Sequence, residues 1–302
     1  MSADTPSVNT TRGLRTLMAI AVLASGCEIF ASRQRINAID HSNKGIEAFN
    51  SGLYDTAEQH FKVGTQTDPT YVIAYFNLGK VYQKQRKWDK AIEAFEQATQ
   101  REPGNASYFY DLGEAYFETK QLEKSEGALK KAAEVDAKLF KAHWRLGQVY
   151  IQLERPKDAD AALRRAIEAN ARLDKPFVDL GHLYLDYDAA KEASQVFSEC
   201  VRANENSSEC FNGWGLALKD LKQFDQATTQ VKRALELEPG LTTAVYNAGM
   251  TYADWYEQSR SNDHKDRARE YLQKYVGNAG AKEGGFGYVK AANDKLYALS
   301  GS

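Results

Sequence analysis

The sequence predicts an all-α solenoid of about seven helix–turn–helix repeats, followed by a C-terminal capping helix. Glycines recur every 34 residues, at Gly45, Gly79, Gly113, Gly147, Gly181, Gly215 and Gly249. In the same register, an aromatic residue stands three positions after most of these glycines. A small residue stands twelve positions after six of them, and a large apolar residue follows four positions later. Periods of roughly 20–50 residues are typical of solenoids, in which each repeat packs only on its neighbours.

The composition is that of a globular protein, with 43% hydrophobic and 26% charged residues among 302. Lys and Arg (39) almost balance Asp and Glu (41), which argues against a dedicated nucleic-acid binder. A mean hydropathy of −0.58 argues against a polytopic membrane protein. Length alone would suggest about two domains of roughly 150 residues. The repeat predicts instead one continuous array.

The N-terminal residues predict an export signal. Arg12 and Arg15 precede an apolar run over 17–24, far shorter than the roughly 20 residues that cross a bilayer as a helix. A basic stretch, a short apolar stretch and then small residues are typical of a secretory signal peptide. A cleaved signal without lipid, an uncleaved anchor and a helix of a cytosolic protein are the alternatives.

The residues Ala24, Ser25, Gly26 and Cys27 resemble the bacterial lipobox. That resemblance implies a signal peptide over 1–26, a lipidated Cys27 with a linker over 27–37, and an anchor in the cell envelope. Glu28 follows the cysteine, where retention at the inner membrane would require Asp. We therefore expect the outer membrane, with the protein facing the periplasm.

The spaced glycines have a physical reason. Glycine within a helix costs about 1 kcal/mol relative to alanine, so their recurrence favours sites where a second helix approaches closely. With Leu78, Gly79, Tyr82, Ala91 and Phe95 in one repeat, the pattern resembles the tetratricopeptide repeat over residues 38–282. The resemblance implies a right-handed superhelix whose concave groove is lined by the first helix of each repeat. Pro156 and Pro176 fit this register as residues of first helical turns.

The C-terminal end departs from the pattern. About seven residues near Gln258–His264 are inserted between the helices of the seventh repeat, and we interpret them as a lengthened loop. Tolerated sequence drift and a loop that projects from the array for a function are the two explanations of this insertion. The glycines over 277–287 predict a hinge, and residues 283–302 predict a capping helix with an apolar stripe at Val289, Ala292, Leu296 and Leu299.

The resemblance also implies which residues face the groove: the second, fifth, ninth and twelfth places of each first helix. These carry an apolar strip with polar neighbours, which is typical of a partner site and suits an extended segment or an amphipathic helix. The predicted partner-binding residues are Phe76, Lys80, Tyr110, Glu114, Phe117, Trp144, Gln148, Ile151, His182 and Leu185. Packing into the core is the alternative, above all for Trp144, because His143 takes the position usually held by an aromatic residue.

In this register Cys200 lies near the end of one helix and Cys210 opens the next, antiparallel helix. The two Cα atoms then lie close enough for a disulfide. A disulfide and two buried free thiols are both open.

No catalytic or metal-binding motif accompanies the repeats. The histidines are scattered, and there is no HExxH, CxxC, GxSxG or phosphate-loop pattern, so we expect no enzyme, metal or cofactor. Asp111 and Glu114 follow Asn77 and Lys80 one repeat later, and this acidic pair argues against a carboxylate clamp.

The predicted function is a non-catalytic, membrane-anchored scaffold that binds proteins of the cell envelope, with no nucleic acid. Lipobox and repeats together resemble two kinds of bacterial lipoprotein. One is the pilotin that assists assembly of a type IV pilus secretin, which we favour, and the other is the adaptor of peptidoglycan enzymes. A module that binds glycans or other ligands through the groove aromatics is a further alternative.

Overall fold

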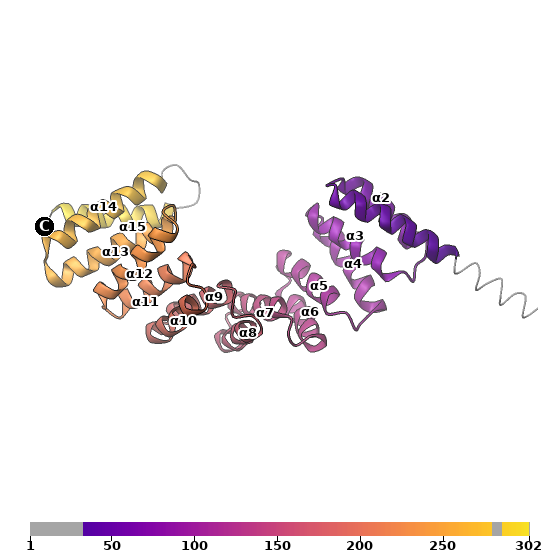
Figure 1. Cartoon of the computed structure of the whole chain (residues 1–302), viewed down its shortest axis with the longest axis horizontal. Coiled ribbons are helices and arrows are strands. Elements are labelled where there is room, and N and C mark those ends of the chain that lie inside the picture. The colour runs from indigo at the N-terminus through magenta and orange to yellow at the C-terminus, as the bar shows by residue number, and fades with distance from the viewer. Residues whose placement is uncertain (1–32, 280–285, 302) are drawn as a thin grey trace, which may run out of the picture. The chain divides into compact units, whose positions relative to one another are not determined.

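The computed structural model describes residues 33–279 and 286–301, and all regular secondary structure in these ranges is α-helical. The chain divides into two compact units, Met1–Val135 and Asp136–Ser302. We call their described parts unit 1 and unit 2. Within each unit, consecutive helices pack antiparallel as hairpins, which Figure 1 shows most plainly for α13 and α14.

Unit 1 begins with a helix over residues 33–50. It continues with α2 (Tyr54–Thr67), α3 (Val72–Lys84), α4 (Trp88–Arg101), α5 (Ala106–Glu118) and α6 (Leu122–Val135). Unit 2 contains α7 (Phe140–Gln152), α8 (Pro156–Ala169), α9 (Lys175–Asp186), α10 (Ala190–Ala203), α11 (Ser208–Asp220), α12 (Phe224–Leu237), α13 (Thr242–Ser259), α14 (Asn262–Ala279) and α15 (Phe286–Ser300). The family expected from the 34-residue period has this order of helix pairs, and Pro156 and Pro176 lie in the first turns of α8 and α9.

The repeated glycines lie where the two helices of a repeat cross. A Cβ atom on Gly79 of α3 would lie 2.5 Å from Cε1 of Phe95 in α4, and one on Gly147 would lie 2.5 Å from Cγ of Leu163. The large residue sixteen positions after each glycine is fully buried in both cases. The ring or branched chain thus occupies the volume that a side chain on the first helix would need.

The turn within a repeat also recurs every 34 residues. At this position Gly52, Arg86, Lys120, Glu154, Asp188 and Lys222 have positive φ angles between 55° and 75°. After α3, the backbone N–H of Lys87 donates to the carbonyl of Tyr82 at 2.9 Å, and that of Arg86 donates to Gln83 at 3.1 Å. These two bonds are those of a Schellman motif, which satisfies the last carbonyls of the helix.

The first helix begins earlier than the sequence predicts, because residues 33–37 are helical rather than part of a linker. Their place is fixed by side chains. The guanidinium of Arg35 pairs with the buried carboxylate of Asp68, donates to Thr70 Oγ1 at 2.8 Å, and lies 5.2 Å from the ring of Tyr71. The array therefore starts within six residues of Cys27, which itself lies outside the described residues.

The insertion in the seventh repeat lengthens helices rather than a loop. Both α13 and α14 have 18 residues, against 13 and 14 in α11 and α12, and only Arg260 and Ser261 separate them. The added turns are held by stacking of Trp255 on His264, whose ring centroids lie 3.8 Å apart. Of the residues 277–287 expected to form a hinge, those up to Ala279 belong to α14 and those from Phe286 on belong to α15, whereas residues 280–285 lie outside the described ranges.

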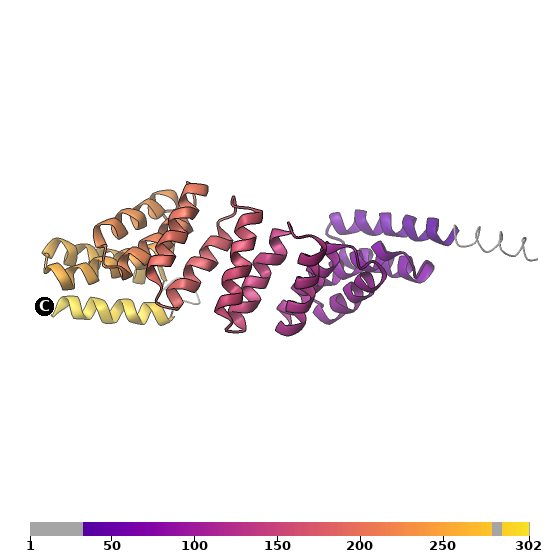
Figure 2. The ribbon, with the colours of Figure 1, turned by 90° about the horizontal axis from the view of Figure 1, so that it is seen from below.

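Helix α15 packs on α13 and α14, as the two views of the last helices show (Figures 1 and 2). Ala292 and Leu299 are buried there, and Val289 and Leu296 pack against the same cluster. The apolar stripe expected of a capping helix thus faces the last helix pair.

Candidate functional site

The groove positions of unit 2 line a cavity of about 880 Å³. Four of its lining residues stand at the fifth place of successive first helices: Trp144 (α7), Val178 (α9), Asn212 (α11) and Tyr246 (α13). Because these helices repeat with the same register, equivalent side chains fall into one line. We call this cavity the unit 2 groove.

Trp144 lies in this groove and not in the core. Its indole Nε1–H donates to Asp179 Oδ2 at 2.7 Å, and its side chain is half-buried. His143 is buried beside it, with Nε2 2.9 Å from the carbonyl oxygen of Ala137. The histidine therefore fills the core position, which leaves the tryptophan free to face the groove.

The other groove residues predicted for unit 2 fall into two groups. Gln148, His182 and Leu185 line the cavity, with His182 exposed and Leu185 half-buried. Ile151 is half-buried on α7, outside that lining. Of these four predicted residues, Gln148, His182 and Leu185 thus share one surface in this unit, and Ile151 does not line it.

Aromatic side chains close the C-terminal end of the groove. The ring of Tyr246 lies 5.1 Å from that of Tyr275 in α14 and 5.2 Å from that of Tyr288 in α15. Burial and the neighbouring phenols raise the pKa of Tyr246, so its hydroxyl stays protonated and able to donate. Tyr288 is 64% exposed, so an aromatic face remains open to a ligand.

Side chains of adjacent repeats are joined by hydrogen bonds between residues that lie about one repeat apart in the sequence. Gln148 Nε2 donates to Asp179 Oδ2 at 2.9 Å, and Lys80 Nζ in unit 1 pairs with Asp111 Oδ1 at 2.9 Å. Both link the ninth place of one first helix to the sixth place of the next. Asp179 was missed in the sequence, although polar residues at the sixth place in most repeats were a signal for it.

The groove residues predicted in unit 1 are more involved in packing. Phe76 contacts the core, with its ring 4.5 Å from that of Tyr108 and 5.7 Å from that of Phe95. The charge of Lys80 is matched by the buried Asp111. Phe76 is thus partly buried against the core of unit 1, and its role in binding stays a prediction.

Tyr110, Glu114 and Phe117 are half-buried on α5. The ammonium of Lys120 lies 5.5 Å from the ring of Phe117. Their role in binding stays a prediction.

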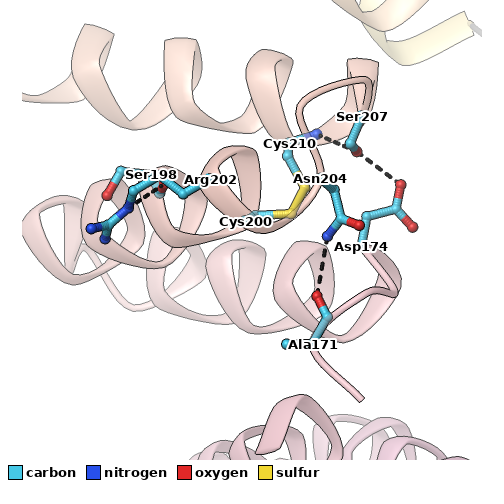
Figure 3. Close-up of a disulfide and its surroundings, with 8 residues drawn as sticks. All are labelled: Ala171, Asp174, Ser198, Cys200, Arg202, Asn204, Ser207 and Cys210. Carbon is cyan, nitrogen blue, oxygen red and sulfur yellow. Dashed lines mark hydrogen bonds between the residues drawn. A yellow bond between two sulfur atoms is a disulfide. The ribbon is translucent and has the colours of Figure 1, made fainter.

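Cys200 and Cys210 are joined in a disulfide, with Cα atoms 6.0 Å apart, between α10 and α11 (Figure 3). Both residues are fully buried. Ser207 caps α11 by accepting a bond from the N–H of Cys210 at 3.3 Å, and its hydroxyl donates to Asp174 Oδ2 at 2.8 Å. The start of α11, which carries the groove residue Asn212, is thus tied both to α10 and to the segment before α9.

Within the described ranges, no three His, Cys, Asp or Glu side chains come together as a metal site would require. In the same ranges, no helix is both long and apolar enough to span a membrane.

A family model described as the cilia and flagella-associated protein 70 C-terminal domain, a tetratricopeptide-type domain, matches residues 40–254. This match covers more than half of the 302 residues, so the chain belongs to that tetratricopeptide-repeat family. No curated protein sequence matches the chain at a significant level.

Solved structures share the fold. The C-terminal part of a repeat-containing protein from Cytophaga hutchinsonii has a TM-score of 0.67 and 15% identity, over 83% of this chain and 98% of that one. Pseudomonas aeruginosa pilF has a TM-score of 0.56 and 17% identity, over 70% of this chain and 96% of that one. YrrB is described as a tetratricopeptide-repeat protein with an unusual peptide-binding site. It has a TM-score of 0.51 and 19% identity, over 62% of this chain and 96% of that one.

Proposed function

We propose that this member of the tetratricopeptide-repeat family is a lipid-anchored scaffold of the bacterial cell envelope that binds a segment of a partner protein in the unit 2 groove. Tetratricopeptide arrays are protein-interaction scaffolds, and YrrB is described as having a peptide-binding site. The observation that carries the proposal is the groove itself, a cavity of about 880 Å³ lined by Trp144, Leu185 and Tyr246. A pocket with apolar walls and a few fixed polar groups is the usual form of a binding site.

The lipobox at Cys27 supports the anchor. The described part of the first helix starts at residue 33, and the six peptide steps that separate it from the lipidated cysteine span at most about 20 Å. A partner of this protein is then itself at or near the membrane surface. We place the protein at the outer membrane, facing the periplasm, on the strength of Glu28.

A partner that must reach the outer membrane fits a pilotin-like role in the assembly of a secretin. The adaptor of peptidoglycan enzymes is the second role consistent with an anchored groove. The two are separated in the native host by deleting the gene. Loss of secretin multimers from the outer membrane supports the first role, and loss of hydrolases from the complexes recovered with the protein supports the second.

The groove is tested by photocrosslinking in intact cells. A photoreactive amino acid replaces His182, which is exposed in the groove, and in a matched control it replaces Gln226, which is exposed on α12. We expect a discrete crosslinked product from position 182 that is absent from position 226. Identical products from both positions would contradict a groove-bound partner.

The anchor is tested by metabolic labelling with palmitate. The unaltered protein should incorporate label and fractionate with membranes, whereas Cys27→Ser should do neither. Labelling that survives Cys27→Ser would show that the lipobox is not used.

A further inference from the structure

Three carboxylates line the unit 2 groove: Asp179 and Asp186 on α9 and Glu209 on α11. Asp186 and Glu209 are exposed, and Asp179 is half-buried. Within the part of the chain that the structure describes, none of the three forms an ion pair. Among the described residues, the groove thus carries three carboxylates that are not engaged in ion pairs.

Asp179 is the best defined of these groups. The indole of Trp144 and the amide of Gln148 both donate to its Oδ2 atom, at 2.7 and 2.9 Å. Both donors are neutral, so they orient the carboxylate without cancelling its charge. The other oxygen, Oδ1, receives neither bond and is the natural acceptor for a cationic donor.

The lining has two lysines, Lys175 and Lys219, against its three carboxylates. The ammonium of Lys219 pairs with Asp220 at 3.3 Å, outside the three groove carboxylates. The ammonium of Lys175 lies 5.6 Å from the ring of Trp144, within the range of a cation–π contact. The lining also holds the exposed imidazole of His182 and the phenols of Tyr246, Tyr275 and Tyr288.

We infer that the unit 2 groove selects a partner segment that carries arginine or lysine beside aliphatic or aromatic residues. The basic side chain pairs with Asp179 Oδ1 next to Trp144, and the apolar neighbours contact Leu185, Leu216 and Met250. This inference rests on the proposed function, because it names the chemistry of the segment that the groove holds. Complementary charge sets specificity and association rate more than affinity alone, so a segment rich in Asp or Glu should be rejected.

The test is a selection of random displayed peptides on the purified full chain. Three proteins are compared: the unaltered chain, Asp179→Asn, and the control Asp225→Asn, which removes an exposed carboxylate on α12 of the same unit. Asparagine keeps an oxygen that accepts the bonds from Trp144 and Gln148, so Asp179→Asn removes the charge with little change of shape. Circular dichroism and the melting temperature verify that each variant is folded.

We expect arginine and lysine to be enriched in peptides selected on the unaltered chain and on Asp225→Asn, and not on Asp179→Asn. A selected peptide should bind Asp179→Asn about tenfold more weakly, as loss of one partner of a charged pair predicts, and rising salt should weaken its binding to the unaltered chain.

Two other outcomes would overturn the inference in distinguishable ways. Peptides that lose binding when Leu216 is changed to Gln, yet carry no excess of basic residues, would refute the cationic segment and leave groove binding intact. A failure to select any peptide that depends on Leu216 would count against the proposed function itself.

Discussion

Phe95 of α4 lies directly over Gly79 of α3, so that a Cβ atom on the glycine would be 2.5 Å from the ring carbon Cε1. Carbon atoms that are not bonded do not approach so closely, and the fully buried ring has no open space into which to move. The glycine of each repeat is thus paired with one large side chain of the second helix, and the pair sets the distance between the two helices.

Gly79→Ala should destabilise the fold by about 1–3 kcal/mol, the usual cost of overpacking a core. The matched control is Gly127→Ala in α6, where an added Cβ meets no atom within 4 Å. There alanine should stabilise by about 1 kcal/mol through helix propensity alone. Urea unfolding followed by circular dichroism measures both. Equal effects of the two changes would show that Phe95 does not require the glycine.

The positive φ angle in the turn within the repeat predicts that a change to glycine there stabilises the fold. Glu154 has φ 55°, a conformation that favours glycine, and its side chain is exposed. Glu154→Gly should therefore stabilise by about 0.5–1 kcal/mol, while Gly52→Ala in the first repeat should destabilise by about as much. Gly52 has no atom within 4 Å of an added Cβ, so its effect comes from the backbone alone. Thermal melts of both variants check the pair, and a loss of stability in Glu154→Gly would refute the argument.

Much of this architecture could be predicted from the sequence because it depends on a period. The seven glycines, the small residues and the large residues indicated which helices pack and where they touch. The period could not predict deviations that depend on one contact. Arg35 extends the first helix because Asp68 and Thr70 lie within its reach, and Trp255 with His264 turns an expected loop into added helical turns.

The groove was predictable by position but not by the role of each residue. Phe76 and Trp144 occupy the same place in their repeats, yet Phe76 packs on Tyr108 while Trp144 bonds to Asp179. Whether the side chain packs on the core or faces the groove depends on the residue that the next repeat places beside it. The position within the repeat alone does not determine that neighbour.

Glu58 of α2 predicts a dependence of stability on pH. Burial alone would raise its pKa, but hydrogen bonds and charge from Lys62 and Lys87 outweigh this and lower the pKa to about 2, from 4.5. Because the folded state holds the lower pKa, the stabilisation is present above pH 4.5 and is lost as the pH falls towards 2. The lysines are largely exposed, so screening limits the contribution to about 1–2 kcal/mol.

Glu58→Gln should accordingly flatten the decline of stability between pH 5 and pH 2, roughly the window that follows from linkage. The measurement is urea unfolding at several pH values. Glu123→Gln, at an exposed position of α6, serves as the control and should leave the decline unchanged. A Glu58→Gln variant with the same decline as the unaltered protein would exclude this carboxylate as the cause.

The disulfide stabilises the junction of α10 and α11, and we expect that an equivalent disulfide can be introduced at another junction. Cys200 and Cys210 occupy positions that hold Ala234 and Ala244 at the next junction of unit 2, and all four residues are fully buried. The double change Cys200→Ala and Cys210→Ala should therefore fold, but lose about 2–3 kcal/mol because the cross-link no longer restricts the unfolded chain. Because equivalent positions share their backbone geometry, Ala234→Cys with Ala244→Cys should form a second disulfide. Mass spectrometry after alkylation without reductant detects it, and free thiols at both new positions would show that the α12–α13 junction lacks the geometry that joins α10 to α11.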